Sequence, residues 1–194
     1  MVRNKIFLYF LFFLGTGVSF YGCSSNDTVK QTTPPKEKSN GFNADSFAFY
    51  EQALLQDSSN IQLHLVLGNN YYVKMNYEKA IDHLLKVCRI DEKNTIALIG
   101  LGNIYYDMEQ YQKAIDYYEK ALVLDNNNVN VRCDLATCYL NIKNTEKACA
   151  LLKKNIELDH NHAQSHHNLS VVYKEMGKVK EADEEMKIFN SLRK

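Results

Sequence analysis

Residues 95–128, TIALIGLGNIYYDMEQYQKAIDYYEKALVLDNNN, decide the fold of this chain. Within these 34 residues, apolar or small side chains recur three or four positions apart over two consecutive segments: Leu98, Leu101, Gly102 and Tyr105, then Tyr111, Ala114, Ile115, Tyr118, Ala121 and Leu122. Residues at this spacing share one face of an α-helix. The stretch therefore predicts two helices that pack against each other, with Gly102 and Ala114 allowing their backbones to approach closely.

The same unit occurs four times along the chain. Shifting the sequence by 34 residues aligns four columns: Leu67, Leu101, Leu135 and Leu169; Gly68, Gly102, Ala136 and Ser170; Tyr71, Tyr105, Tyr139 and Tyr173; and Ala80, Ala114, Ala148 and Ala182. A single helix pair of this size cannot bury its own apolar face, so the copies must stack. We therefore predict an all-α solenoid of about nine antiparallel helices.

These motifs resemble those of the tetratricopeptide repeat (TPR) family. In that family Leu-Gly-x-x-Tyr lies on the first helix of the unit (helix A), an Ala lies on the second (helix B), and Ala-Leu-x-Leu-Asp ends the unit. Here these motifs stand at residues 101–105, at Ala114 and at residues 121–125. The resemblance extends from Ile61 to about Leu192, and it implies a right-handed superhelix that binds proteins or peptides in its concave groove.

Two features of the family are absent from most copies. The proline that closes the unit is replaced by Glu92, Asn126 and His160. The glycine of the turn between the helices remains only as Gly177, and its place is taken elsewhere by Met75, Glu109 and Lys143. Because a left-handed backbone costs a non-glycine residue about 1 kcal/mol, we expect strain at these three turns.

The domain organisation follows from the repeat period and the composition. We expect a signal peptide at residues 1–22, a lipidated cysteine and flexible linker at 23–42, a capping half repeat at 43–60, and four repeats at 61–94, 95–128, 129–162 and 163–194. The linker contains both prolines of the chain and a single aliphatic residue, Val29, so it cannot bury enough apolar area to fold.

The N-terminus resembles a bacterial lipoprotein signal. A short basic start with Arg3 and Lys5 precedes 17 uncharged residues, 6–22, and then Cys23. The resemblance implies that the Cys23 thiol is acylated and anchors the chain in the cell envelope, in the outer rather than the inner membrane. An uncleaved anchor and ordinary secretion remain alternatives, because Phe20 and Tyr21 depart from the usual pattern before the cysteine.

Charge and motifs argue against two classes of function. Lys and Arg number 23, and Asp and Glu also number 23, so the composition does not suggest the basic surface that nucleic-acid binding needs. The sequence contains no nucleophile with a neighbouring base, no phosphate-binding glycine loop and no His-Glu-x-x-His motif. We therefore expect a protein that is not an enzyme, has no cofactor and binds no nucleic acid.

The family resemblance also implies which residues line the groove. Carried over position by position, the partner-binding residues are Leu65, Val66, Asn69, Tyr72, Ile96, Ile99, Asn103, Tyr106, Thr137 and Asn168. Asn69 and Asn103, one repeat apart, have carboxamides that can donate to and accept from a peptide backbone. The position that binds a carboxylate in some relatives holds Leu65, Ile99 and Cys133 instead of basic residues, so we expect a segment with aliphatic side chains.

Three further possibilities concern the C-terminal half. Asp159, His162 and His166 could hold a zinc ion, although a polar loop that leads into a helix explains them equally well. Cys138 and Cys149 could form a disulfide, or serve as small core residues like Cys88. On the last helix, Ile188, Phe189 and Leu192 either pack back onto the array or support weak self-association.

From these observations we expect a membrane-anchored TPR scaffold or adaptor that binds a protein or peptide during assembly of envelope complexes. Similar lipoproteins act as pilotins for pilus secretins or as adaptors for peptidoglycan hydrolases, which makes a pilotin-like role one alternative. A metal- or redox-linked module built on the third and fourth repeats is the other.

Overall fold

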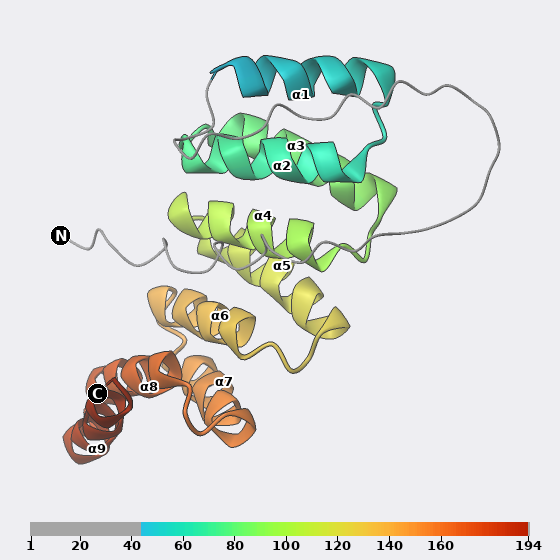
Figure 1. Cartoon of the computed structure of the whole chain (residues 1–194). Helices are drawn as coiled ribbons and strands as arrows, with labels where there is room; N and C mark the ends of the chain where they lie inside the picture. Colours follow the sequence, from blue (N-terminus) through green and yellow to red (C-terminus); the bar gives the residue numbers. More distant parts are fainter. Residues whose placement is uncertain (1–43, 194) are drawn as a thin grey trace, which may run out of the picture. The chain divides into compact units, whose positions relative to one another are not determined.

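The computed structural model describes residues 44–193, and the signal, Cys23 and linker predictions lie outside this part. Within it the chain forms nine α-helices and no strand: α1 (Ala44–Gln56), α2 (Ile61–Val73), α3 (Tyr77–Ile90), α4 (Thr95–Asp107), α5 (Tyr111–Leu124), α6 (Val129–Asn141), α7 (Thr145–Leu158), α8 (Ala163–Glu175) and α9 (Val179–Leu192). Figure 1 shows them stacked in chain order, from α1 to α9. No helix in this part of the chain is long and apolar enough to cross a membrane.

Asparagine side chains cap the N-termini of most of these helices. Asn60, Asn94 and Asn128 each accept a hydrogen bond from the backbone N–H three residues later, at the start of α2, α4 and α6. Asn76 and Asn144 do the same for α3 and α7. Each cap satisfies one backbone donor that the helix leaves unpaired, and such caps are typically worth about 1 kcal/mol.

The turns inside the four repeats adopt the left-handed conformation that the sequence predicted. Met75, Glu109 and Lys143 have φ angles of 59°, 58° and 62°, and Gly177 has a φ of 73°. In each turn the backbone N–H two residues after the C-cap donates a hydrogen bond to the carbonyl of the tyrosine three residues before the C-cap. For example, Asn76 N–H donates to the Tyr71 carbonyl at 2.9 Å. This is the Schellman arrangement, which favours glycine at the left-handed position.

The buried core divides into two clusters that meet on α4. One runs from Phe47 of α1 to Leu101 and Ile104 of α4. The other starts at Leu98 of α4 and runs to Ala182 of α9. Residues 95–128, the most regular unit of the sequence, therefore join the N-terminal and C-terminal parts of one continuous array.

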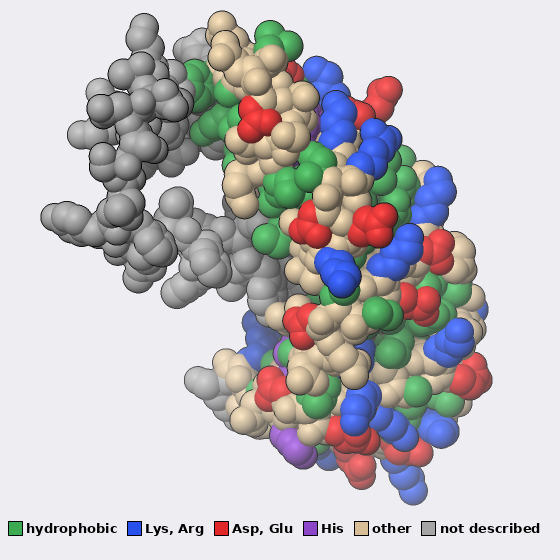
Figure 2. Space-filling view, turned by 90° about the vertical axis from the view of Figure 1, so that its right-hand side faces the viewer, with side chains coloured by type: hydrophobic (Ala, Val, Ile, Leu, Met, Phe, Trp, Pro, Cys, Tyr) green, Lys and Arg blue, Asp and Glu red, His purple; other side chains and the backbone are tan. Residues whose placement is uncertain are grey.

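The array curves with its first helices on the inside. Along the described chain, α2 contacts α4 and α6 contacts α8 directly, whereas the second helices α3, α5, α7 and α9 do not contact each other to the same extent. Closer spacing of the first helices makes them the inner side of the stack. Figure 2 shows acidic and basic side chains intermingled along the right-hand side of the molecule.

Candidate functional site

The inner face is defined here by the exposed sides of α2, α4, α6 and α8. All ten residues that the family resemblance assigned to the groove lie on these helices, and none of them is buried: Leu65, Val66, Asn69 and Tyr72 on α2; Ile96, Ile99, Asn103 and Tyr106 on α4; Thr137 on α6; and Asn168 on α8. The structure thus brings them onto one side of the array, and their role in binding stays a prediction.

Asn103 is held in a defined orientation by the core beneath it. The Tyr118 hydroxyl on α5 donates to the Asn103 Oδ1 atom at 2.7 Å. Tyr118 is itself 2% exposed, and burial raises the pKa of its hydroxyl, which keeps that hydroxyl a donor. Its two Nδ2–H groups have no partner among the described residues and can donate to a ligand.

Asn69, one repeat earlier, has no such support. The position equivalent to Tyr118 is Leu84, which has no polar atom. Asn69 and Asn103 therefore differ in their surroundings, because only Asn103 of the two accepts a hydrogen bond from the core, and their common role in binding stays a prediction. Comparing the columns one repeat apart, Leu84 against Tyr118, could have revealed this difference from the sequence.

Two carboxylates, Asp107 and Asp134, lie at groove positions of the inner face, as the family resemblance implies. The Tyr72 hydroxyl of α2 donates to the Asp107 Oδ2 atom of α4 at 2.7 Å and so links the first two repeats. Burial raises the pKa of Asp107, and this effect exceeds the opposing effect of the Tyr72 hydrogen bond. Neither Asp107 nor Asp134 of α6 forms an ion pair with any residue in 44–193.

Asp134 remains accessible to solvent, yet the surrounding protein displaces part of its water. This desolvation raises the pKa of its carboxyl group. The same carboxylate raises the pKa values of Tyr72 and Tyr106, which places it near both tyrosines. The central part of the inner face therefore combines aromatic surface with two partly desolvated carboxyl groups that lack an internal counter-ion.

The C-terminal part of the inner face uses its polar groups internally. Asn168 donates from Nδ2 to the Thr137 hydroxyl at 3.1 Å and to the Cys133 sulfur at 3.2 Å. Its Oδ1 accepts from Gln164 at 2.6 Å. Through these contacts Asn168 and Thr137 join α6 to α8, and their predicted contact with a partner stays a prediction.

The three residues considered for zinc do not converge on a common point. His162 bonds to the Ser165 hydroxyl at 2.7 Å and to Asn130 at 3.0 Å through its two ring nitrogens. His166 bonds to Glu185 at 2.6 Å and to the His160 carbonyl at 3.0 Å. No group of three or more potential ligands that could hold a metal ion lies in the described part of the chain, Asp159 included.

The remaining candidates were the cysteines and the apolar residues of the last helix. Cys88, Cys133, Cys138 and Cys149 are free thiols, and the last three are buried. Burial raises the pKa values of Cys133 and Cys138 to about 12, which makes them poor nucleophiles. Phe189 packs back onto His167 with ring centroids 4.9 Å apart, whereas Ile188 remains exposed.

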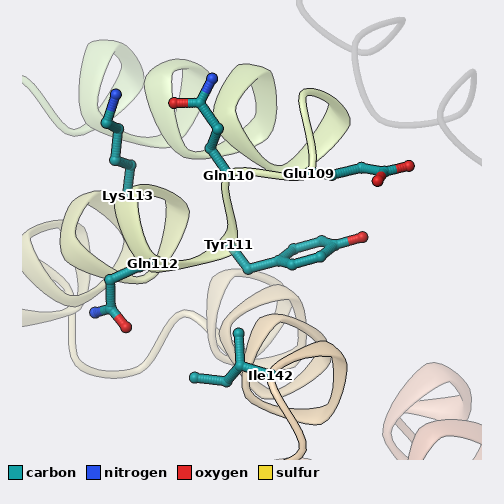
Figure 3. A pocket seen from close by; sticks show the side chains of 6 residues that line it. All are labelled: Glu109, Gln110, Tyr111, Gln112, Lys113 and Ile142. Atoms are coloured by element: carbon teal, nitrogen blue, oxygen red, sulfur yellow. The ribbon is translucent and has the colours of Figure 1, made fainter.

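A shallow depression of about 380 Å³ lies between the α4–α5 turn and Ile142 at the end of α6. Its other lining residues are Glu109, Gln110, Tyr111, Gln112 and Lys113. Figure 3 shows that their side chains point in different directions, with Gln110 and Lys113 turned away from Tyr111. Because polar groups do not converge there, the inner face is the better candidate for a binding site.

Comparison with known proteins identifies the repeat type. The family model for the fourth ARM domain of tetratricopeptide repeat protein 21 matches residues 98–194, which are 97 of the 194 residues. No curated protein sequence matches the chain.

Several solved structures share the fold. The crystal structure of MamA has a TM-score of 0.72 and 22% identity, over 76% of this chain and 86% of that one. MamA 41-end from Desulfovibrio magneticus RS-1 also has a TM-score of 0.72, with 16% identity over 77% and 84% of the two chains. YrrB, described as a TPR protein with an unusual peptide-binding site, has a TM-score of 0.68 and 28% identity over 76% of each chain. The prediction of an all-α solenoid is confirmed, and the chain belongs to the tetratricopeptide repeat family.

Proposed function

We propose that this protein is a non-catalytic TPR scaffold whose inner face, at α2, α4 and α6, binds a peptide segment of a partner protein. The observation that carries the proposal is the Asn103 carboxamide, which Tyr118 holds in place through its oxygen while its Nδ2–H groups remain available as donors. A peptide backbone offers carbonyl acceptors at regular intervals to such a donor. The unusual peptide-binding site of YrrB, a protein with the same fold, supports a ligand of this class.

The chemistry of the inner face favours a segment with aliphatic side chains and at least one basic side chain. Leu65, Val66 and Ile99 are partly exposed, and Ile96 is 56% exposed, so they offer apolar surface to the partner. Asp107 and Asp134 lack internal counter-ions, so a Lys or Arg of the partner would face them favourably. Tyr72 and Tyr106 add rigid contact area beside these carboxylates.

The membrane attachment and the envelope role are also part of the proposal. They rest on the sequence of residues 1–23 alone, which predicts acylation of Cys23 and a tether of the array to the outer membrane. In this arrangement the scaffold would recruit its partner during assembly of an envelope complex. Substituting Cys23→Ala should release or mislocalise the array on membrane fractionation, and an unchanged distribution would point to an uncleaved anchor.

The binding proposal is tested by crosslinking in native envelopes followed by mass spectrometry. Replacing Asn103→Ala should reduce the yield of crosslinked partner about 10-fold, since a lost hydrogen bond at a desolvated site costs about 1.4 kcal/mol. Gln112→Ala on the outer helix α5 is the matched control, because it removes an exposed carboxamide that bonds only to Asp116 at 3.3 Å. Equal partner yields from both variants and the wild type would contradict the proposed site.

A further inference from the structure

Two histidines are buried against each other in the first repeat. His64 of α2 and His83 of α3 are 2% and 9% exposed, and their Nδ1 atoms are 2.9 Å apart. The His64 Nε2 atom lies 3.1 Å from the Ser58 carbonyl, and the His83 ring stacks on Tyr71 with centroids 5.6 Å apart. The pair therefore joins both helices of the repeat to the loop that precedes them.

The protonation state of the pair follows from its hydrogen bonds. The Ser58 carbonyl can only accept, so His64 carries a proton on Nε2. A neutral His64 then has a bare Nδ1, and His83 must donate its Nδ1–H to that atom. A proton added to His83 therefore makes a buried imidazolium. Burial disfavours this charged form in the folded state.

The surroundings do not compensate for this charge. The ionisable groups that face the pair are Glu51 of α1, Asp57 of the α1–α2 loop, Tyr71 of α2, and Lys79, Asp82 and Lys86 of α3. Burial, His64 and Lys86 lower the pKa of His83, and Asp82 and Glu51 oppose them only partly. The result is a pKa of about 4 for His83, below its ordinary value of 6.5.

The lowered pKa of His83 determines how the stability of the first repeat depends on pH. Between pH 6.5 and pH 4 the opened state binds a proton at His83 that the folded state excludes, so stability is full above this window and falls as the pH drops through it. For one proton, the equilibrium constant for opening increases about 20-fold between pH 7 and pH 5.

The position of the pair limits which helices respond. Tyr71 donates to Glu51 of α1, so α1, α2 and α3 are connected through the same cluster. In a stack where each repeat contacts only its neighbours, a terminal repeat can open while the remaining repeats stay folded.

We propose that the His64–His83 pair is an acid-sensitive latch, which increases the equilibrium constant for opening of α1, α2 and α3 from the array about 20-fold at mildly acidic pH while α5 to α9 stay folded. The inner face would then lose Leu65, Val66 and Asn69, which α2 carries. This consequence for binding rests on the proposed function, but the latch itself does not.

Hydrogen exchange of the full-length chain at pH 7 and pH 5 tests the latch directly, after correction for the intrinsic pH dependence of exchange. The amides of α2 and α3 should lose about 20-fold in protection at pH 5, while those of α5 and α7 should change little. An equal loss of protection in all four helices, or none in any, would overturn the latch whether or not the inner face binds a peptide.

The second repeat supplies the matched variant. Its residues equivalent to His64 and His83 are Leu98 and Tyr117, and Tyr117 stacks on Tyr105 with centroids 5.5 Å apart, just as His83 stacks on Tyr71. His64→Leu/His83→Tyr should therefore fold and keep its α2 and α3 protection at pH 5. His166→Leu, which removes a buried histidine of the fourth repeat, should leave the acid response of α2 and α3 unchanged. If the double variant loses as much protection at pH 5 as the wild type does, the acid response does not come from this pair.

Discussion

Two junctions between repeats, that of repeats 1 and 2 and that of repeats 3 and 4, have different residue types at equivalent buried positions. At the first junction Val87 of α3 and Ala97 of α4 are both fully buried. At the second, the equivalent residues are Asn155 of α7 and Ser165 of α8, also fully buried, and the Asn155 Nδ2 atom donates to the Ser165 hydroxyl at 3.0 Å. One junction is held by apolar packing and the other by a hydrogen bond.

The polar junction extends through further residues. Arg132 is 4% exposed and donates to Asn155 Oδ1 at 3.1 Å and to the Asn126 side chain at 3.0 Å. Asn155 also donates to the Val129 carbonyl at 2.6 Å. In the second repeat the residue equivalent to Arg132 is Leu98, so this network has no counterpart there.

The inner face shows the same contrast between the two halves. Asn168 in the last repeat uses its hydrogen bonds on Thr137, Cys133 and Gln164, whereas Asn103 in the second repeat keeps its donor groups available. The two side chains thus differ in use: Asn168 is held in internal contacts, whereas the Nδ2–H groups of Asn103 have no partner among the described residues. Two asparagines on the same face, at different positions of the repeat, therefore have different hydrogen-bond surroundings.

Breaking the polar junction should have the greatest effect on stability. Asn155→Val removes three hydrogen bonds and leaves the Arg132 guanidinium buried with fewer acceptors, so the free energy of unfolding should fall by about 3 kcal/mol or more. Urea unfolding monitored by circular dichroism measures this loss.

The control for this prediction converts the whole junction to the chemistry of the first one. Arg132→Leu/Asn155→Val/Ser165→Ala takes Val87 and Ala97 from the first junction and Leu98 from the second repeat, because the first repeat has His64 at that position, and it should recover most of the lost stability. If the triple variant is less stable than Asn155→Val alone, the two junctions are not interchangeable.

An intermediate effect is expected where a glycine supports the inner face. A Cβ atom at Gly102 would lie 2.5 Å from the Tyr118 ring, so Gly102→Ala must displace that buried ring from Asn103. We expect a loss of about 2 kcal/mol, within the range for overpacked cores. Gly102→Ala/Tyr118→Leu copies Ala136 and Leu152 of the third repeat and should restore stability, as thermal unfolding would measure, although leucine cannot form the Asn103 contact.

A smaller effect is expected at the turns, which differ between the first three repeats and the last. Glu109→Gly gives the α4–α5 turn the glycine that the fourth repeat has at position 177. It should raise the free energy of unfolding by about 0.5 kcal/mol, because the relief of backbone strain exceeds the cost of the added entropy of the unfolded chain. Gly177→Ala should lower it by about 1 kcal/mol. Urea titrations measure both changes. If the two substitutions change the free energy of unfolding in the same direction, the left-handed backbone is not their common cause.

The sequence predicted the regular features well because each depends on residues close together in the chain. Helical spacing of apolar residues indicated the helices, and the exchange of glycine for Met75, Glu109 and Lys143 marked the left-handed turns. The side-chain contacts between helices were not predicted. Tyr118 to Asn103, Asn168 to Thr137 and the buried pair His64–His83 join residues from different helices, and a family pattern does not specify them.

The amino-acid sequence alone dictates that this chain is a stacked array of helix pairs, because a 34-residue period of apolar positions leaves every pair with a face that only another pair can cover. Which polar side chains are available and which are used internally is settled by tertiary structure. The physical reason is that hydrogen bonding of a carboxamide or imidazole depends on atoms within about 3 Å, which the fold brings together from positions far apart in the chain.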